Sequence, residues 1–443
     1  MKDVLPVHRP ETPSLPQPYY LSFSRRVIIG MFTAAILGGI SAAGAASLYT
    51  NGSKRIALAY LAALAFVLSI SLGSLFFTLI QHLTRAGWAV LIRRPAEVFA
   101  MNTITVGILS LPIIWSAYSG SQSIYPWATG VSVPELVSHV EGQHDSHDPK
   151  AHVYVHQQFD ALTASKTPWL NPSFFTLRIG CYFLIWVAIA SFYFHHSRNL
   201  DEQGGIASTL SMERWAGPSI LLFALSLTFA SFDLLMSLDP HWYSTIFGVY
   251  YFAGCAVGGF SVSLLSWLVL SHLAIMPVQI SSSHLRDLGR LLFAFIFFWG
   301  YIAFSQYMLL WYANIPETTR WWAVRGASTA DGLQSSWGIV LVILALGHFV
   351  IPFLGLMSRH VKDHRKAMMF WTIWILVMHY LDLYWLVMPE FRNSIAFGLP
   401  ELGSLLLVCG IYAIGASFFA TRTSMVPIGD PRIPASAALS DAY

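Results

Sequence analysis

Residues 56–80 read IALAYLAALAFVLSISLGSLFFTLI, a run that contains no charged side chain. A helix of this length spans the roughly 30 Å hydrocarbon core of a bilayer, because each residue advances it by about 1.5 Å. Nine further apolar runs occur in the chain, and we expect the helix of residues 56–80 to continue past the membrane towards Ile92. We therefore predict an all-α integral membrane protein whose ten transmembrane helices cover residues 27–48, 56–80, 96–118, 172–195, 217–236, 243–271, 290–313, 334–357, 367–388 and 400–420.

The composition of the 443 residues agrees with this prediction. Hydrophobic residues make up 55% of the chain and charged residues 11%, against about 25% charged in ordinary soluble domains. The proline-rich segment 1–24 does not have the pattern of a cleavable signal peptide. No nucleotide-binding loop is present, which argues against an ATP-driven pump, and we expect a lipid membrane and no nucleic acid as the surroundings of the chain.

The distribution of positive charge predicts the orientation of the chain. Arg178 lies within the fourth predicted helix, and the loops 49–55, 119–171, 237–242, 314–333 and 389–399 hold 7 of the 25 Lys and Arg residues. The other 17 lie in the alternate loops and the two tails. Because short loops rich in Lys and Arg stay in the cytoplasm, we predict a cytoplasmic N-terminal tail (1–26) and a cytoplasmic C-terminal tail (421–443) around a membrane domain of residues 27–420.

The cysteines and loop histidines form no recognisable ligand pattern. Cys181, Cys255 and Cys409 lie in separate apolar runs, so we expect no covalent haem, iron–sulfur cluster or metal site in this chain. The longest loop, about 119–171, is predicted to lie outside the membrane. Its histidines are irregularly spaced, which favours a solvated docking loop over a metal site: His139, His144, His147, His152 and His156.

Matching helix ends indicate an internal repeat. The fifth predicted helix ends near Asp233 and reaches a proline seven residues later, and the ninth does the same after Asp382. The second and sixth predicted helices end at His82 and His272 in similar surroundings. Both matches are four helices apart. We therefore predict two four-helix bundles, helices 2–5 and 6–9, with helices 1 and 10 flanking them.

Polar side chains within the predicted spans are candidates for function, because each is costly in a bilayer. His379 and Asp382 are three residues apart on one predicted helix, so we expect them to share a face and to form a hydrogen bond. A histidine beside a carboxyl in an apolar bundle can exchange protons near neutral pH. The candidate proton path comprises Asp233, His379, Asp382, His348, His82, Arg178 and Gln306.

A competing interpretation is that these groups only bond helices together. Asp233 or Asp382 would then pair with Arg178. A b-type haem between His348 and His379 is disfavoured, because no repeated histidine pair brackets a helix pair. The glycines between positions 248 and 259 are interpreted as sites of close helix packing.

Three stretches resemble a known family. They are residues 231–250 (SFDLLMSLDPHWYSTIFGVY), 304–317 (FSQYMLLWYANIPE) and 79–84 (LIQHLT). They are similar to membrane subunits of the NrfD and polysulfide-reductase superfamily, and within it to the F subunit of bacterial alternative complex III, also described as quinone-binding subunit 2. The resemblance covers roughly residues 20–425 and leaves out the tails and much of the longest loop.

The resemblance implies a place in the bacterial cytoplasmic (inner) membrane, in a respiratory complex that oxidises menaquinol. Such a complex passes electrons to a cytochrome c or directly to a terminal oxidase. The implied partners are a multihaem cytochrome c subunit with haem c, an iron–sulfur subunit with its clusters, and a second NrfD-like membrane subunit. That second subunit, the C subunit, is the main candidate for the quinol site, and menaquinone is retained as a candidate ligand of this chain.

The sequence thus predicts a membrane subunit of an electron-transport oxidoreductase complex that contributes a proton path and a scaffold, without redox cofactors of its own. One alternative is a purely structural assembly subunit. Another is an autonomous secondary transporter. Transporters usually have helices broken by glycine or proline at matching positions near mid-membrane. We expect an interior proline only in the eighth helix, Pro352, close to one end.

Overall fold

The computed structural model describes residues 20–48, 52–119, 124–128, 165–273, 280–328, 332–333, 335–391, 395 and 397–438. Apart from two very short strands, the regular structure in these residues is helical, and ten spans are long and apolar enough to cross a membrane. The predicted fold class is therefore confirmed, and the chain is a multi-pass helical membrane protein. The five histidines of the predicted docking loop lie outside the described residues.

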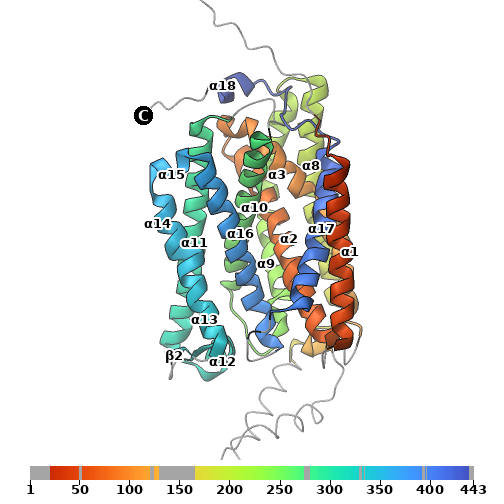
Figure 1. Cartoon of the computed structure of the whole chain (residues 1–443), viewed down its shortest axis with the longest axis vertical. Coiled ribbons are helices and arrows are strands. Elements are labelled where there is room, and N and C mark those ends of the chain that lie inside the picture. Colours follow the sequence, from red (N-terminus) through yellow and green to blue (C-terminus); the bar gives the residue numbers. More distant parts are fainter. Residues whose placement is uncertain are drawn as a thin grey trace, which may run out of the picture.

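Eight of these ten spans are single helices, which run along the long axis of the molecule (Figure 1). They are α1 (Arg25–Leu48), α2 (Gly52–Leu83), α8 (Pro172–Gln203), α9 (Ala207–Leu234), α10 (Phe247–His272), α11 (Ser282–Ala313), α16 (Arg365–Val387) and α17 (Leu399–Ala420).

The third and eighth spans are divided. The third consists of α3 (Arg93–Met101), α4 (Thr103–Leu109) and α5 (Leu111–Ser116). The eighth consists of α13 (Ser335–Leu344), the π-helical turn η5 (Ala345–Val350) and α14 (Ile351–Met357).

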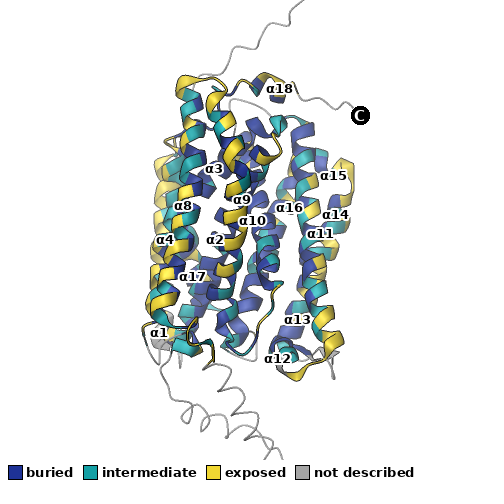
Figure 2. Cartoon of the chain, turned by 180° about the vertical axis from the view of Figure 1, so that it is seen from behind, coloured by how far each residue is buried: buried dark blue, intermediate teal, exposed yellow. Residues whose placement is uncertain are grey.

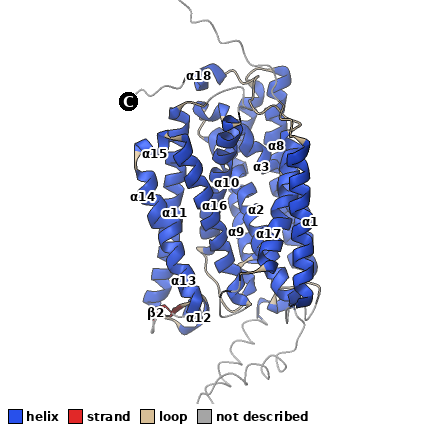
Figure 3. Ribbon diagram, viewed as in Figure 1, coloured by secondary structure: helices blue, strands red, loops and turns tan. Residues whose placement is uncertain are grey.

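Short elements lie at the ends of the spans. They are η1 (Gly87–Leu91), η3 (Pro126–Ala128), η4 (Met236–Leu238), α12 (Pro316–Val324), α15 (Arg359–Asp363), η6 (Met388–Glu390) and α18 (Ile433–Ala437). The strands β1 (Ala327–Ser328) and β2 (Gly332–Leu333) pair antiparallel. Figure 3 shows how small this sheet is beside the helices.

The helices α2 and α10 form the centre of the molecule. In the most apolar part of each, 78% and 72% of the residues are buried, against 17% in α1. Helix α2 packs on α3 and α9 of the first bundle, and α10 packs on α11 and α16 of the second. Buried residues accordingly gather on the inner helices (Figure 2). The predicted pair of four-helix bundles is thus confirmed, with their contact along α2 and α10.

Glycines let these two central backbones touch. A Cβ atom on Gly73 of α2 would lie 1.7 Å from the carbonyl oxygen of Cys255 on α10. One on Gly259 of α10 would lie 2.3 Å from the carbonyl carbon of Gly73. This supports the prediction that the glycines of the sixth span serve helix packing, which small residues permit in a membrane.

The first and last spans pair with each other outside the bundles. Helix α17 packs along α1 and also on α2 (Figure 1). A Cβ atom on Gly38 would lie 2.4 Å from the backbone nitrogen of Leu407, and one on Gly410 would lie 2.9 Å from Ala35. The two flanking helices therefore form one tightly packed pair.

The repeated helix ends have the same local structure. Asp233 lies in the last turn of α9, and the 3₁₀ turn η4 follows before Pro240. Asp382 lies near the end of α16, where the 3₁₀ turn η6 includes Pro389. In each bundle, therefore, a buried carboxyl near the end of the last helix is followed by a 3₁₀ turn and by a proline seven residues after the carboxyl.

Several expectations about individual helices are wrong. Helix α2 ends at Leu83 and does not continue towards Ile92, because Arg85 adopts a positive φ of 53° and turns the chain. Pro352 is also not the only interior proline. Pro218 lies inside α9, and Pro112 lies in the first turn of α5, just after the third span is interrupted at Ser110.

The predicted C-terminal tail is docked on one end of the bundle in its described part, residues 421–438, here named the C-terminal segment. Asp430 lies 3.1 Å from Arg93 and 3.0 Å from Arg432. Burial alone would raise the pKa of Asp430, but hydrogen bonds from Arg432 and the charge of Arg93 hold it below its usual value. Tyr20 forms a β-bridge with Ser424, so the first described residue contacts the C-terminal segment.

Candidate functional site

Asp233 lies in a buried ion pair. Its carboxylate is 2.8 Å from both Nε and Nη2 of Arg178 on α8. The hydroxyl of Tyr182 donates to it at 2.8 Å and the indole N–H of Trp169 at 3.1 Å. This is the pairing that the helix-bonding interpretation anticipates, because removal of either charge would leave the other buried and unpaired.

Asp382 has neutral partners instead. The hydroxyl of Tyr250 on α10 donates to one carboxyl oxygen, and Nε1 of Trp299 on α11 donates to the other at 3.2 Å. The residue is 1% exposed, and no cationic side chain pairs with it among the described residues. The two aspartates that the repeat makes equivalent therefore differ: a guanidinium neutralises Asp233, whereas Asp382 is held by neutral hydrogen-bond donors.

The side chain of His379 fills a space between the central helices α2 and α10. Its Nε2 lies 2.7 Å from the hydroxyl of Ser69 on α2, and its Nδ1 has no hydrogen-bond partner in the described part of the chain. A Cβ atom on Gly254 would lie 2.8 Å from the imidazole, and one on Gly258 would lie 3.0 Å from it. Two glycines of α10 thus make the space that this ring occupies.

His348, in the eighth span, completes a cluster of buried polar side chains with Asp382 and His379. It lies in the π-helical turn η5, a kind of irregularity that is frequent at functional sites. The ring is fully buried, its centroid is 4.0 Å from that of Trp299 and 6.1 Å from that of His379, and neither nitrogen has a partner among the described atoms. Four spans, α2, α10, α11 and α16, therefore enclose the cluster together with η5.

The expected hydrogen bond between His379 and Asp382 is not formed. Both side chains are bonded elsewhere, His379 to α2 and Asp382 to α10 and α11. A three-residue separation places the two on one side of α16, but the neighbouring helices decide where each side chain points. The two groups thus belong to one cluster without direct contact.

His82 lies at the C-terminal end of α2, near the C-terminal segment. It is 2% exposed, packs on Tyr193, and its Nε2 has no described partner. Its counterpart His272 is exposed, so this part of the repeat is not equivalent in surroundings. Thirteen residues of α2 separate His82 from Ser69, about 20 Å along the helix. The unpartnered hydroxyl of Ser74 lies within that interval.

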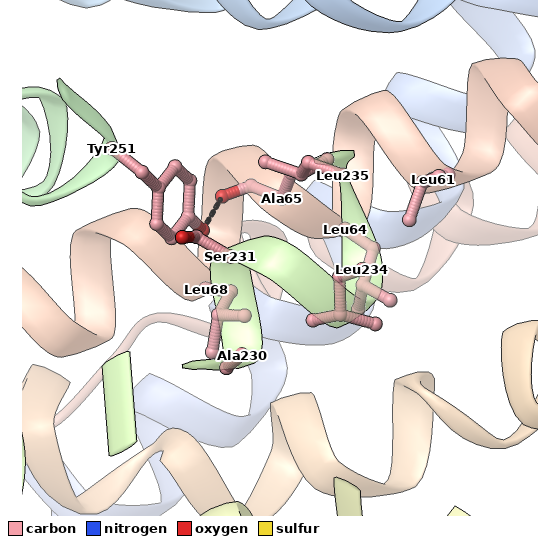
Figure 4. Close-up of a pocket in the computed structure, with 9 residues that line it drawn as sticks. All are labelled: Leu61, Leu64, Ala65, Leu68, Ala230, Ser231, Leu234, Leu235 and Tyr251. Carbon is pink, nitrogen blue, oxygen red and sulfur yellow. Dashed lines mark hydrogen bonds between the residues drawn. The ribbon is translucent and has the colours of Figure 1, made fainter. Parts of the chain in front are cut away.

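Gln306 lies apart from the histidines, on the wall of a cavity of about 410 Å³. Tyr250 and Trp299, the two donors to Asp382, line the same cavity. By contrast, the space between α2, α9 and α10 holds about 10 Å³ and is lined mostly by leucine and alanine. There Tyr251 donates to the carbonyl of Ala65 at 3.0 Å (Figure 4). That space is therefore large enough for little more than one water molecule.

Sequence reasoning missed several residues of these clusters. Tyr250, Trp299 and Ser69 carry no signal by themselves, because a tyrosine, a tryptophan or a serine is ordinary in a membrane helix. A second buried ion pair was also missed: Arg55 of α2 donates to Glu401 of α17 at 2.7 and 2.9 Å. Arg55 precedes the apolar run of α2 and reads as a surface charge until α17 is packed beside it.

The described residues contain no group of three or more His, Cys, Asp or Glu side chains that could hold a metal ion. The three cysteines are free. No known family model and no curated protein matches the chain. In the described residues, the fold and the buried polar clusters define a helical membrane protein with ten spans. Its second bundle holds a buried carboxyl and two buried histidines that form no ion pair within this part of the chain.

Proposed function

We propose that this chain is the membrane subunit of a bacterial quinol-oxidising respiratory complex and that it carries a proton path through its second bundle. The resemblance of residues 231–250 and 304–317 supports the place in the complex, and two bundles with a flanking helix pair agree with it. The observation that carries the proton path is the contrast between the two aspartates: Asp233 pairs with Arg178, whereas Asp382 has no cationic partner in the described part of the chain.

The path runs through groups that can hold or pass a proton. Asp382 and the hydroxyl of Tyr250 form its outer part, and the imidazoles of His348 and His379 continue it towards Ser69. An imidazole accepts a proton at one nitrogen and releases one from the other, which suits a relay. His82 lies at the cytoplasmic end in this proposal. Asp233 and Arg178 bond helices and take no part in the transfer.

The proposal is tested first by association. The tagged chain is purified in a mild detergent, and its partners are identified by mass spectrometry and by haem staining. We expect a multihaem cytochrome c and an iron–sulfur subunit to accompany it. Purification of the chain by itself would contradict the assignment to a respiratory complex.

The proton path is tested in the complex after reconstitution into liposomes. We expect Asp382→Asn to lower the number of protons moved per electron while electron transfer persists, because an amide cannot release a proton. The matched control is Asp287→Asn, a carboxyl at an exposed pair with Arg290. An unchanged ratio in Asp382→Asn would refute the path.

A purely structural assembly subunit remains the second candidate, and the buried ion pairs favour it. Arg178 joins α8 to α9 through Asp233, and Arg55 joins α2 to α17 through Glu401. In that case both aspartates serve packing alone. An autonomous transporter has less support, because the third span is divided whereas its counterpart in the repeat, α11, is continuous.

A further inference from the structure

We propose that the corner of the second bundle around Lys362 binds an anionic phospholipid, with the lipid phosphate at the lysine ammonium and one acyl chain along α11 and α14. Lys362 lies in the short helix α15, which connects α14 to α16 and packs on α11 (Figure 1). The site uses none of the side chains of the proposed proton path, and it does not depend on the proposed respiratory complex.

Positive charge is concentrated at this corner. Six Lys and Arg side chains and two carboxylates lie in the first turns of α11, in α15 and at the start of α16. The cations are Arg286, Arg290, Arg359, Lys362, Arg365 and Lys366, and the carboxylates are Asp287 and Asp363. The resulting excess of four positive charges attracts an anionic lipid head, as basic pockets at the ends of membrane helices do.

Both carboxylates of the corner already have a cationic partner. Asp363 lies 2.8 Å from Arg286, and Asp287 lies 2.7 Å from Arg290. No carboxylate pairs with Lys362 in the part of the chain that the structure describes. Burial and the nearby charge of Arg290 lower the pKa of the Lys362 ammonium. A negatively charged phosphate beside this ammonium would offset both effects.

The side chain of Lys362 is held against α11. The residue is only 8% exposed, and its stem lies on Gly289, where an added Cβ atom would be 3.1 Å from Cγ and 3.3 Å from Cδ of the lysine. The ammonium lies 4.9 Å from the ring centroid of Phe293. A lysine at a membrane surface usually extends its ammonium into water. Here the packing on α11 keeps the charge beside an apolar surface instead.

An aromatic row continues from Lys362 along the contact between α11 and α14. Phe293 stacks on Phe353 with ring centroids 4.9 Å apart, and Phe297 lies 5.9 Å from Phe353. Phe297 and Leu354 are 50% and 59% exposed on the outside of these apolar spans. The surface of the molecule therefore offers a cation and, next to it, an apolar strip, which is the order of headgroup and acyl chain in a phospholipid.

The charge of the corner selects the headgroup. Phosphatidylglycerol carries a phosphodiester with a net negative charge, whereas phosphatidylcholine carries a quaternary ammonium beyond its phosphate. That ammonium would lie among the cations of the corner and be repelled by them. A free phosphate ion would satisfy Lys362 but has nothing to place on the aromatic row. An anionic phospholipid satisfies both the charge and the apolar strip.

The test is photolabelling of the protein, purified in micelles with the subunits that accompany it, by a phosphatidylglycerol with a diazirine on one acyl chain. Labelled peptides are identified by mass spectrometry. We expect label on α11 and α14, and competition by unlabelled phosphatidylglycerol but not by phosphatidylcholine or inorganic phosphate. Equal competition by phosphatidylcholine would show an unselective acyl-chain surface, and competition by inorganic phosphate would show a simple anion site. Either result, or the absence of label on both helices because another subunit covers them, would overturn the proposal.

Two variants with a matched control separate charge from packing. Lys362→Gln keeps part of the stem on Gly289 and removes the charge. We expect labelling by the phosphatidylglycerol probe to fall about tenfold, the ratio that one charge-assisted hydrogen bond supplies near the lower end of its range. Lys362→Glu should abolish that labelling, and labelling by the corresponding phosphatidylcholine probe should change little in both variants. The control is Lys54→Gln, at a partly buried lysine at the start of α2 on the opposite predicted side of the membrane, which should leave both probes unaffected.

Labelling by the phosphatidylcholine probe reports whether α11 and α14 remain packed. An equal fall with both probes in Lys362→Gln would mean that the lysine only packs helices, and it would overturn the proposal. Unchanged labelling by the phosphatidylglycerol probe in both Lys362 variants would overturn it as well. The proton ratio of Asp382→Asn does not enter these outcomes, so the lipid site and the proton path stand or fall separately.

Discussion

The contrast between the two buried aspartates can be measured as a difference in stability. We compare Asp233→Asn with Asp382→Asn, the same chemical change at the two equivalent positions of the repeat. The first variant leaves the guanidinium of Arg178, which is 6% exposed, without its counter-charge. The second removes no partner of an ion pair among the described residues. We therefore expect Asp233→Asn to be much the more damaging.

The contacts give the size of the effect. Breaking a buried ion pair by removal of one partner costs about 3–5 kcal/mol, and Asp233 makes two contacts of 2.8 Å to Arg178. In Asp382→Asn the remaining oxygen still accepts one hydrogen bond, so about one bond, or roughly 1 kcal/mol, is lost. The expected difference between the variants is about 2–4 kcal/mol.

The assay is equilibrium unfolding of the purified protein in mixed micelles, followed by tryptophan fluorescence. A double variant, Asp233→Asn with Arg178→Gln, completes a double-mutant cycle for this ion pair. Because the second change removes the orphaned charge, the double variant should be more stable than the sum of the single effects predicts.

Equal losses in the two single variants, within about 0.5 kcal/mol, would refute the reasoning. So would additivity in the double variant. Either result would mean that Arg178 and Asp233 are not energetically coupled in the folded protein in micelles.

Three further predictions follow from the packing. Gly73→Ala should lower thermal stability by about 1–3 kcal/mol, since its Cβ would overlap the α10 backbone, whereas Gly180→Ala, where the Cβ meets nothing within 4 Å, should be neutral in the same melt. Glu401→Gln removes the carboxylate charge that pairs with Arg55, and cysteine cross-linking between α2 and α17 should become less efficient. Because the native pKa of Asp430 is lowered, its contribution to docking of the C-terminal segment is fully present above the ordinary carboxyl pKa of 3.8 and is lost as the pH falls through the native value, which limited proteolysis of residues 421–438 should show.

The sequence predicted the helices well because the bilayer imposes a simple length rule. The ten runs, the repeat marked by Asp233 and Asp382, and the flanking position of the first and last helices all appear in the structure. The boundaries differ mainly where a helix extends beyond the apolar run, as α8 does to Gln203. A helix keeps its backbone hydrogen bonds after it leaves the hydrocarbon core, so it does not have to end where the apolar run ends.

The candidate site was predictable only in part. Buried ionisable groups such as His348 and Asp382 stand out in an apolar run, so the list of candidates came directly from the residues. Their partners did not, because the contact of Asp382 with Tyr250, 132 positions away, depends on how α10 and α16 pack. The cavity beside Gln306 was equally invisible, since an unfilled space has no residue of its own.

The pairing of α1 with α17 has a consequence for biosynthesis. Helix α1 ends at Leu48 and its partner α17 begins at Leu399, so about 350 residues are translated between them. At roughly 5–20 residues per second, the first helix waits tens of seconds in the membrane with its glycine face uncovered. The pairing of α1 with α17 is therefore one of the last steps in folding. A nascent protein released before α17 is complete would expose the glycine face of α1 to insertases and membrane proteases.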